Sequence, residues 1–308
     1  MDACCPVIVF AFNRPKHLQT TLDSLAANTL SGNTDVTIIC DGPRGQQDVA
    51  LTDAVRQVAY GEQRFRSVSV QANTDNRGLT LNIISGVSAM LEVHERVIVL
   101  EDDLATSPHF LAYMNDALNL YADDKAVASI QGWCFPHAVH DAPETFFLRG
   151  TDCWGWATWQ RAWKMLNMDA LALLEEIRRQ KLQKVFNADG QYDYETMLED
   201  AAAGRVSSWA VRWHASAFLQ NCCSLYPAES LILNKGFDTG THFDNYQLSQ
   251  QGYKHSSVSV VAQPVCENRV MRNAYNVWLR NSVGGPVWYF RIKRVLNKCR
   301  SFVAALFK

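Results

Sequence analysis

Short apolar runs alternate with helix-like patterns through the first part of the chain. The runs expected to form strands are Val7–Phe12, Val36–Cys40, Val68–Gln71 and Val97–Leu100. Apolar residues at a spacing of three to four predict helices over Pro15–Ala27, Leu79–Val93 and Ser107–Tyr121. Ser107 suits an N-cap, and Pro108 suits the first turn of the last helix. Short apolar strands separated by helices predict an α/β protein with a parallel sheet covered on both faces.

The pattern changes after about residue 125. A mixed-charge segment, Leu171–Val185, predicts a helix, whereas "SSWAVRWHASAF" (207–218) alternates in a way that predicts a strand. No linker-like, repeated or low-complexity stretch separates the two parts. We therefore predict one domain over residues 1–265, made of a first part (1–125) and a second part (126–265). Residues 266–308 form a separate basic segment.

Polar residues follow three of the predicted strands. Asn13 and Arg14 follow the first, Asp41 follows the second, and the triplet Glu101–Asp103 ends the fourth. The carboxyl ends of parallel strands meet at one edge of a sheet, where ligands bind. Three adjacent carboxylates repel one another, and a divalent cation removes that cost. Mg²⁺ and Mn²⁺ take one or two protein carboxylates plus phosphate oxygens, so the strand order favours a metal–diphosphate site over a solvated acidic loop.

Composition narrows the class of protein. The 308 residues are 48% hydrophobic and 19% charged, with a net charge of −2, which argues against nucleic-acid binding. The adjacent pairs Cys4–Cys5 and Cys222–Cys223 do not match a zinc-binding CxxC pattern. The first strand begins almost at Met1, so we expect no signal peptide and reduced cysteines in a cytoplasmic protein. No apolar run is long enough to predict a transmembrane helix.

The motifs "FAFNRP", "IICDGP" and "VIVLEDDL", in this order, resemble those of inverting glycosyltransferases of the GT-A fold. The resemblance is to the N-acetylglucosaminyltransferase I group and its bacterial relatives, in which an EDD triplet replaces the more common DXD motif. It covers roughly residues 5–245. It implies a Rossmann-like, mostly parallel central sheet flanked by helices, with the nucleotide bound by residues 1–125 and the acceptor by 126–265. The implied cofactor is Mn²⁺ (or Mg²⁺), and the expected donor is a UDP-sugar.

Carried over by motif, the resemblance assigns roles to the triplet. Asp103 would bind the metal, Asp102 would lie near the ribose or the metal, and Glu101 would lie near the transferred sugar. The residues that would face the nucleotide are Asn13, Arg14 and, on the base, Asp41. A helix-entry role for Arg14 and a turn role for Asp41 remain open alternatives.

Two further segments carry candidate donor contacts. Arg77 precedes a helix whose amino terminus favours anions, so it is expected near the diphosphate or the uridine. A simple helix cap at Asn76 or Thr80 is the alternative. In the resembled family, the equivalent of "NKGFDTGTHFDNY" closes over the donor, which would bring His242 to the metal or the phosphates. A solvated loop is the alternative for His242.

The stretch "DCWGWATW" concentrates indole side chains. Indole faces stack on the C–H faces of sugars, so Trp154 and Trp156 are candidate platforms for donor or acceptor. Either of them could instead fill the core. Trp159 and Trp163 are expected in the core.

An inverting transfer needs one general base, which takes the proton from the acceptor hydroxyl. In the resembled family this base is an Asp near the start of a helix that follows the aromatic segment. Asp193 in "GQYDYETML" fits best, with Glu195 and Asp152 as runners-up. A carboxylate that only serves the helix dipole is the alternative for Asp193.

The carboxyl-terminal segment is basic, because no acidic residue follows Glu267. An apolar stripe runs through Trp288, Ile292, Val295, Cys299, Phe302 and Leu306. A basic amphipathic helix predicts peripheral contact with an anionic membrane, here the cytoplasmic face of an inner membrane. A helix docked on the protein or in a dimer is the alternative. Membrane contact would suit a lipid-linked glycan acceptor, as in lipopolysaccharide or other surface polysaccharide synthesis.

Two other functions compete with a glycosyltransferase. A sugar nucleotidyltransferase usually carries a Gly-rich loop with Arg or Lys after the first strand, but "FAFNRPKHL" has no glycine. A non-catalytic, membrane-associated carbohydrate-binding protein would keep the tryptophans and the basic segment without needing the acidic triplet.

Overall fold

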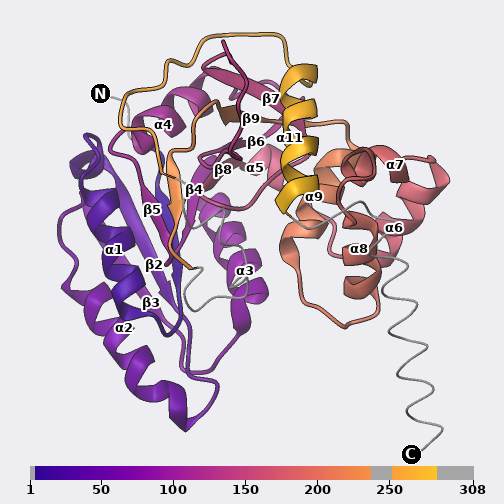
Figure 1. The fold of residues 1–308 in the computed structure, drawn as a ribbon. Coiled ribbons are helices and arrows are strands. Elements are labelled where there is room, and N and C mark those ends of the chain that lie inside the picture. Colours follow the sequence, from indigo (N-terminus) through magenta and orange to yellow (C-terminus); the bar gives the residue numbers. More distant parts are fainter. Residues whose placement is uncertain (1–3, 237–251, 283–308) are drawn as a thin grey trace, which may run out of the picture.

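The computed structural model describes residues 4–236 and 252–282. Eight strands form one sheet in the order β3-β2-β1-β4-β8-β6-β9-β7 (Figure 1). Their bounds are β1 Val7–Ala11, β2 Asp35–Cys40, β3 Ser67–Ala72, β4 Arg96–Glu101, β6 Val127–Gln131, β7 Thr145–Arg149, β8 Trp156–Trp159 and β9 Cys223–Pro227. Two short strands, β5 Leu104–Thr106 and β10 Ile232–Asn234, pair separately and antiparallel.

Helices flank the sheet, and several helices of the second part of the chain form a group to one side of it (Figure 1). The helices of the first part are α1 Pro15–Ala26, α2 Val49–Gly61, α3 Gly78–Val93 and α4 Phe110–Leu120. Those of the second part are α5 Gln160–Trp163, α6 Ala170–Arg179, α7 Gln183–Phe186, α8 Tyr194–Ala202, α9 Trp209–Leu219 and α11 Arg269–Ser282.

The sheet is mostly parallel, which confirms the predicted α/β class with its helix-flanked central sheet. Strands β3, β2, β1 and β4 are parallel neighbours, as are β6 and β9, whereas β8 and β7 run antiparallel to theirs. All five residues of β1 are buried, as are Val97–Leu100 of β4. Strands that are buried on both faces appear in a sequence as continuous apolar runs. For this reason β1 and β4 could be predicted from the sequence.

Residues 207–218 were expected to form a strand, and this expectation was wrong, because helix α9 begins at Trp209 and runs to Leu219. The helix lies between two hydrophobic cores. Trp209, Trp213 and Ala217 pack into the core of the sheet, whereas Val211, Ala215 and Phe218 pack into a second core with α6 and α8. A helix buried on two sides presents apolar residues at nearly every second position. That pattern resembles the alternation of a strand. The residues that face each core do have helical spacing, but this can be seen only once the two cores are known.

Two other boundaries differ from expectation. The helix expected over Leu171–Val185 is divided into α6 and α7, and Lys181 between them has a φ of 58°. The helix expected from Ser107 begins at Phe110, although the Ser107 hydroxyl still accepts a hydrogen bond from the His109 N–H at 3.3 Å. The division into residues 1–265 and 266–308 stays a prediction. The apolar stripe from Trp288 onward lies outside the described residues.

Over the described ranges, no helix combines the length and the apolar character needed to cross a membrane. The eight cysteines in those ranges are all free thiols, namely Cys4, Cys5, Cys40, Cys134, Cys153, Cys222, Cys223 and Cys266.

Candidate active site

The acidic triplet sits in a turn that is held from two sides. Strand β4 ends at Glu101 and β5 begins at Leu104, so the turn carries Asp102 and Asp103. The Thr21 hydroxyl on α1 donates to the Asp102 carbonyl at 2.7 Å. The Lys235 N–H, just after β10, donates to the Asp103 carbonyl at 2.8 Å. The backbone of the triplet is therefore fixed even though its side chains carry like charges.

The triplet opens onto a cavity of about 770 Å³ at the carboxyl ends of β1, β2 and β4. Such a volume suits a ligand of nucleotide-sugar size. The sequence-predicted residues that line it are Asn13, Arg14, Asp41, Glu101, Asp102, Asp103 and Trp154. Parallel strands thus bring together side chains that lie about ninety positions apart.

Arg14 is the counter-charge of the triplet. Its guanidinium pairs with Asp102 and, at 2.9 Å, with Asp103 Oδ2. Burial raises the pKa of Asp102 to about 6, and the charge of Arg14 opposes that effect. Burial and the neighbouring charges of Asp103 and Asp102 raise the pKa of Glu101 to about 8. The raised pKa values show that the charged forms of Glu101 and Asp102 are costly here, and a divalent cation bound beside them would favour those charged forms.

The residues at the triplet suit a metal ion that is held by one or two protein carboxylates and completed by phosphate and water. Over the described residues, no three His, Cys, Asp or Glu side chains form a cluster able to hold a metal ion. Mg²⁺-type sites with one or two protein carboxylates, completed by phosphate and water, need no such cluster. Asp103 lines the cavity, and its side chain is 13% exposed. His242, the second expected ligand, lies outside the described residues.

Asp41 lines the cavity and also caps α3. Its carboxylate accepts hydrogen bonds from the backbone N–H groups of Arg77 and Gly78, both at 2.9 Å, and from side-chain amides. Burial acts to raise the pKa of Asp41, but these hydrogen bonds outweigh it and lower the pKa. A hydrogen bond to a base, as expected for Asp41, would have to replace one of these donors.

The other nucleotide-side residues differ in their placement. Asn13 lines the cavity, where its side-chain amide donates to Asp48 Oδ1 at 3.0 Å. Arg77 does not line the described cavity, and its backbone N–H donates to Asp41. Neither Asn76 nor Thr80 caps α3, because Asp41 does so from the end of β2.

The tryptophans of the aromatic stretch divide between cavity and core. Trp154 is partly exposed and lines the cavity, with an edge contact to Trp133 at 4.9 Å between ring centroids. Trp156 is only 1% exposed and packs against Trp163, Trp209 and Trp213. The expectation of a sugar platform is therefore corrected for Trp156, because no face of its ring is open to a sugar. Trp159 and Trp163 are buried, as expected.

Asp193, the expected base, serves as the N-cap of α8. Its carboxylate accepts from the Thr196 N–H at 3.3 Å and from the Thr196 hydroxyl at 2.8 Å. Glu195 is buried and pairs with Arg178 at 2.8 Å. Neither carboxylate is among the described residues that line the cavity.

Sequence reasoning missed several residues of the cavity wall. The Arg44 guanidinium stacks over the Phe12 ring at 4.5 Å, and both line the cavity. Ser207 and Ser208 just before α9, and Trp209 and Ala210 at its start, also line the cavity. The signal for Arg44 was its position just after the polar end of β2, whereas the α9 residues were hidden by the mistaken strand.

Comparison with known proteins decides the class of enzyme. The sequence model of the family named "Glycosyltransferase like family 2" matches residues 5–181, more than half of the chain. The chain belongs to this family. This member of glycosyltransferase-like family 2 is accordingly a glycosyltransferase, and its sheet is consistent with the GT-A fold. None of the curated proteins matches the sequence of this family member.

Three solved structures show weak similarity to this glycosyltransferase. A cytidylyltransferase from Leptospira borgpetersenii is 12% identical with a TM-score of 0.34, over 53% of this chain and 63% of that one. The mannosyltransferase PcManGT from Pyrobaculum calidifontis, in complex with GDP-Man and Mn²⁺, is 13% identical with a TM-score of 0.35, over 70% and 69%. S. aureus TarS is 14% identical with a TM-score of 0.37, over 74% and 36%. The chain thus spans less than two thirds of the first and the third.

Proposed function

We propose that this glycosyltransferase is metal-dependent and inverting, and that it transfers a sugar from a nucleotide diphosphate donor to a hydroxyl of a surface-glycan acceptor. A UDP-sugar is the expected donor. The observation that carries the proposal is the shared cavity, in which the acidic triplet faces Asn13, Arg14 and the α3 end of the site. A nucleoside diphosphate needs a counter-charge for its phosphates and a wall for its base, and both are properties of this cavity.

The residues divide by chemistry within the cavity. Asp103 and Asp102 would hold a divalent cation, which when bound supplies positive charge to the diphosphate of the leaving group. Arg14 holds Asp102 and Asp103 in place and supplies a second positive charge. The Phe12–Arg44 pair presents a flat, cationic surface against which a base can stack. Trp154 offers an indole face on the acceptor side of the cavity.

The first prediction concerns Asp103. Wild-type protein is expected to unfold at a higher temperature when Mn²⁺ and one member of a panel of UDP-sugars and GDP-mannose are both present. A ligand held at 100 times its dissociation constant stabilises the native state by about 2.7 kcal/mol. Asp103→Asn is expected to lose most of this stabilisation, because the substitution removes a charged oxygen ligand. Differential scanning fluorimetry measures the stabilisation of the wild type and of the variant.

Asp116→Asn is the matched control, because Asp116 is an exposed carboxylate on α4 away from the cavity. It is expected to keep the full donor and Mn²⁺ response. Wild type that gains no stability from any nucleotide sugar with Mn²⁺ would contradict the proposed function. A response that survives in Asp103→Asn would contradict the metal assignment alone.

Peripheral binding to an anionic membrane, with a lipid-linked acceptor at the cytoplasmic face, is a further part of the proposal. Its support is the sequence after Glu267, which contains basic and no acidic residues. Each basic residue near an anionic surface contributes about 1 kcal/mol to binding. Co-sedimentation with phosphatidylglycerol vesicles but not with phosphatidylcholine vesicles is the expected result.

A further inference from the structure

Asp152 lies beside the donor cavity in a partly exposed stretch of an otherwise buried segment. Thr151 and Gly155 are buried, whereas Asp152, Cys153 and Trp154 between them are partly exposed. Cys153 and Trp154 line the cavity. Asp152 therefore sits at the edge of the cavity, one residue away from its wall.

Asp152 and the triplet come to the cavity on different segments of the chain. The triplet follows β4, whereas Asp152 follows β7 and directly precedes Cys153 and Trp154, which line the same cavity as the triplet. The charges that raise the pKa of the Cys153 thiol, after burial itself, belong to Asp152, Glu101 and Asp103. A base that works across a sugar from a metal has to come from a segment other than the one that holds the metal.

The surroundings of Asp152 leave its carboxylate ready to accept a proton. Burial raises the pKa of Asp152 to about 6, and the Cys153 N–H, which donates at 2.8 Å, acts against that rise. The titratable groups that sense the Asp152 charge are Cys134, Cys153, Tyr192, Tyr194, Tyr226 and Tyr275. Among the described residues no Lys, Arg or His contributes to the Asp152 pKa.

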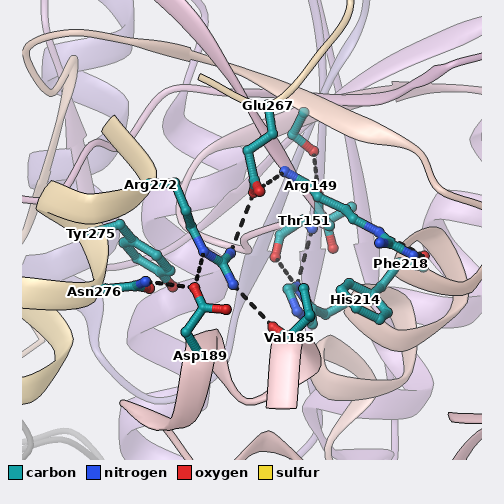
Figure 2. A network of polar contacts seen from close by, with 12 residues as sticks. Arg149, Thr151, Val185, Asp189, His214, Phe218, Glu267, Arg272, Tyr275 and Asn276 are labelled. Carbon is teal, nitrogen blue, oxygen red and sulfur yellow. Dashed lines mark hydrogen bonds and ion pairs between the residues drawn. The ribbon is translucent and has the colours of Figure 1, made fainter. Parts of the chain in front are cut away.

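A rigid network holds the backbone next to Asp152 (Figure 2). His214 Nδ1 lies 2.9 Å from the Thr151 carbonyl and 3.2 Å from the Thr151 N–H, and its ring stacks on Tyr194 at 4.6 Å. Arg272 of α11 reaches Asp189 at 3.3 Å and Glu267 at 3.4 Å. Helix α11 and the α8 side of the molecule are thus fastened to the segment that carries Asp152.

We propose that Asp152 is the general base of the transfer, a proposal that rests on the proposed function. The Asp152 carboxylate takes the proton of the acceptor hydroxyl as that oxygen bonds to the anomeric carbon. The bond from the anomeric carbon to the phosphate oxygen breaks, and its electron pair leaves with the nucleoside diphosphate. His214 is a positioning residue, which fixes Thr151 and thereby the direction of Asp152.

Aromatic side chains around Asp152 suit a sugar acceptor. Trp154, two residues after Asp152, is partly exposed, and so is Tyr192, on which the Asp152 charge acts. The same charge acts on Tyr275 of α11. Aromatic faces bind the C–H faces of sugars, and phenol hydroxyls hydrogen-bond their hydroxyls. The acceptor class that fits this surface is a neutral glycan end.

The test compares Asp152→Asn with wild type in Mn²⁺-dependent hydrolysis of UDP-N-acetylglucosamine, UDP-glucose, UDP-galactose and GDP-mannose, with water in place of the acceptor. For the donor that wild type hydrolyses, kcat is expected to fall by about 10²–10⁴-fold in Asp152→Asn, and Asp152→Glu is expected to recover part of it. Donor stabilisation with Mn²⁺ is expected to stay unchanged, because Asp152 lies at the edge of the cavity on the proposed acceptor side and is not among the residues proposed to hold the donor or the metal. The wild-type kcat is expected to fall on the acid side with a midpoint near pH 6.

Asp169→Asn is the matched control, because Asp169 is an N-cap carboxylate on α6 and Asn can keep the cap. Asp193→Asn separates the two candidate bases. A large loss of kcat in Asp193→Asn, with Asp152→Asn near wild type, would overturn the proposal. Wild type that binds none of the four donors would remove the proposed function, and the base assignment with it. Binding and hydrolysis that both persist in Asp152→Asn would remove the base assignment alone.

Discussion

At the scale of single residues, the sequence predicted which side chains lie near the site, and the structure shows what each of them contacts. Asp41 and the triplet were found together because strand ends mark ligand sites in parallel sheets. Their individual partners were not visible, since the donors to Asp41 come from the start of α3, some thirty-six residues later. Trp154 and Trp156 are two positions apart, and only the packing of α9 against β8 decides that one faces the cavity and the other the core.

Asp41→Asn is predicted to destabilise the fold. The substitution puts an amide N–H₂ where the carboxylate accepts from the Arg77 and Gly78 N–H groups, and a buried donor without an acceptor costs about 1–3 kcal/mol. The lowered pKa of Asp41 means that its contribution is present above the ordinary Asp pKa and is lost as the pH falls through the folded-state value. Urea unfolding at neutral pH measures the loss, and Asp116→Asn should show none.

At the scale of elements, helix α9 shows that hydrophobic periodicity can mispredict a helix that is buried on two faces. A single buried face gives a spacing of three to four, but α9 serves the sheet core and the helical core at once. The strands of the first part have no such ambiguity, so their positions followed from the sequence to within a residue or two. The start of α9 and the two residues before it line the cavity, so the mistaken strand left four wall residues out of the predicted site.

The segment after β7 depends on a glycine for its fit against α9. Gly150 has a φ of +91°, and a Cβ there would lie 2.4 Å from His214 Cε1. Gly150→Ala is predicted to lower the free energy of unfolding by about 2–4 kcal/mol, from backbone strain and overpacking together. It should also lower kcat more than it changes donor stabilisation, because Asp152 follows two residues later.

A double-mutant cycle isolates the contact between a Cβ at position 150 and the His214 ring. His214→Ala removes the ring against which the new Cβ would press, so Gly150→Ala/His214→Ala should be less destabilised than the sum of the single variants by about 1 kcal/mol. Additive losses would mean that strain at the positive φ, and not the approach of His214, accounts for the whole effect.

At the scale of the whole molecule, the candidate active site joins two parts of the chain that are built differently. The nucleotide side is built from consecutive strands and helices, and for that reason short motifs predicted it. The proposed acceptor side is built from β7, α8, α9 and α11, whose contacts join residues far apart in sequence. Arg272 pairs with Asp189 (Figure 2), and the Tyr194 and Tyr275 hydroxyls form a hydrogen bond. Single-sequence patterns carry no record of such contacts, so the sequence could not show where Asp193, Glu195 and Asp152 lie relative to the cavity.

The junction between the cores also sets a pH limit on the fold. Burial lowers the pKa of His214 to about 4, the charges of Arg272 and Arg149 lower it further, and the hydrogen bond to Thr151 acts against them. An unfolded histidine takes up a proton near pH 6.5. Between pH 6.5 and 4 the histidine of the unfolded chain therefore binds a proton that His214 does not bind in the native state. The free energy of unfolding falls as the pH falls through this window.

The expected loss is about 3 kcal/mol by pH 4, and it should be measurable as a fall in the urea midpoint between pH 7 and 4. His214→Asn is predicted to flatten this part of the profile even if it lowers stability at pH 7, because Asn takes up no proton in either state. His140→Asn, in an exposed turn, should keep the wild-type slope. Parallel profiles for wild type and His214→Asn would show that the native junction accepts the proton, and that the ring held against Gly150 is not kept neutral by its burial.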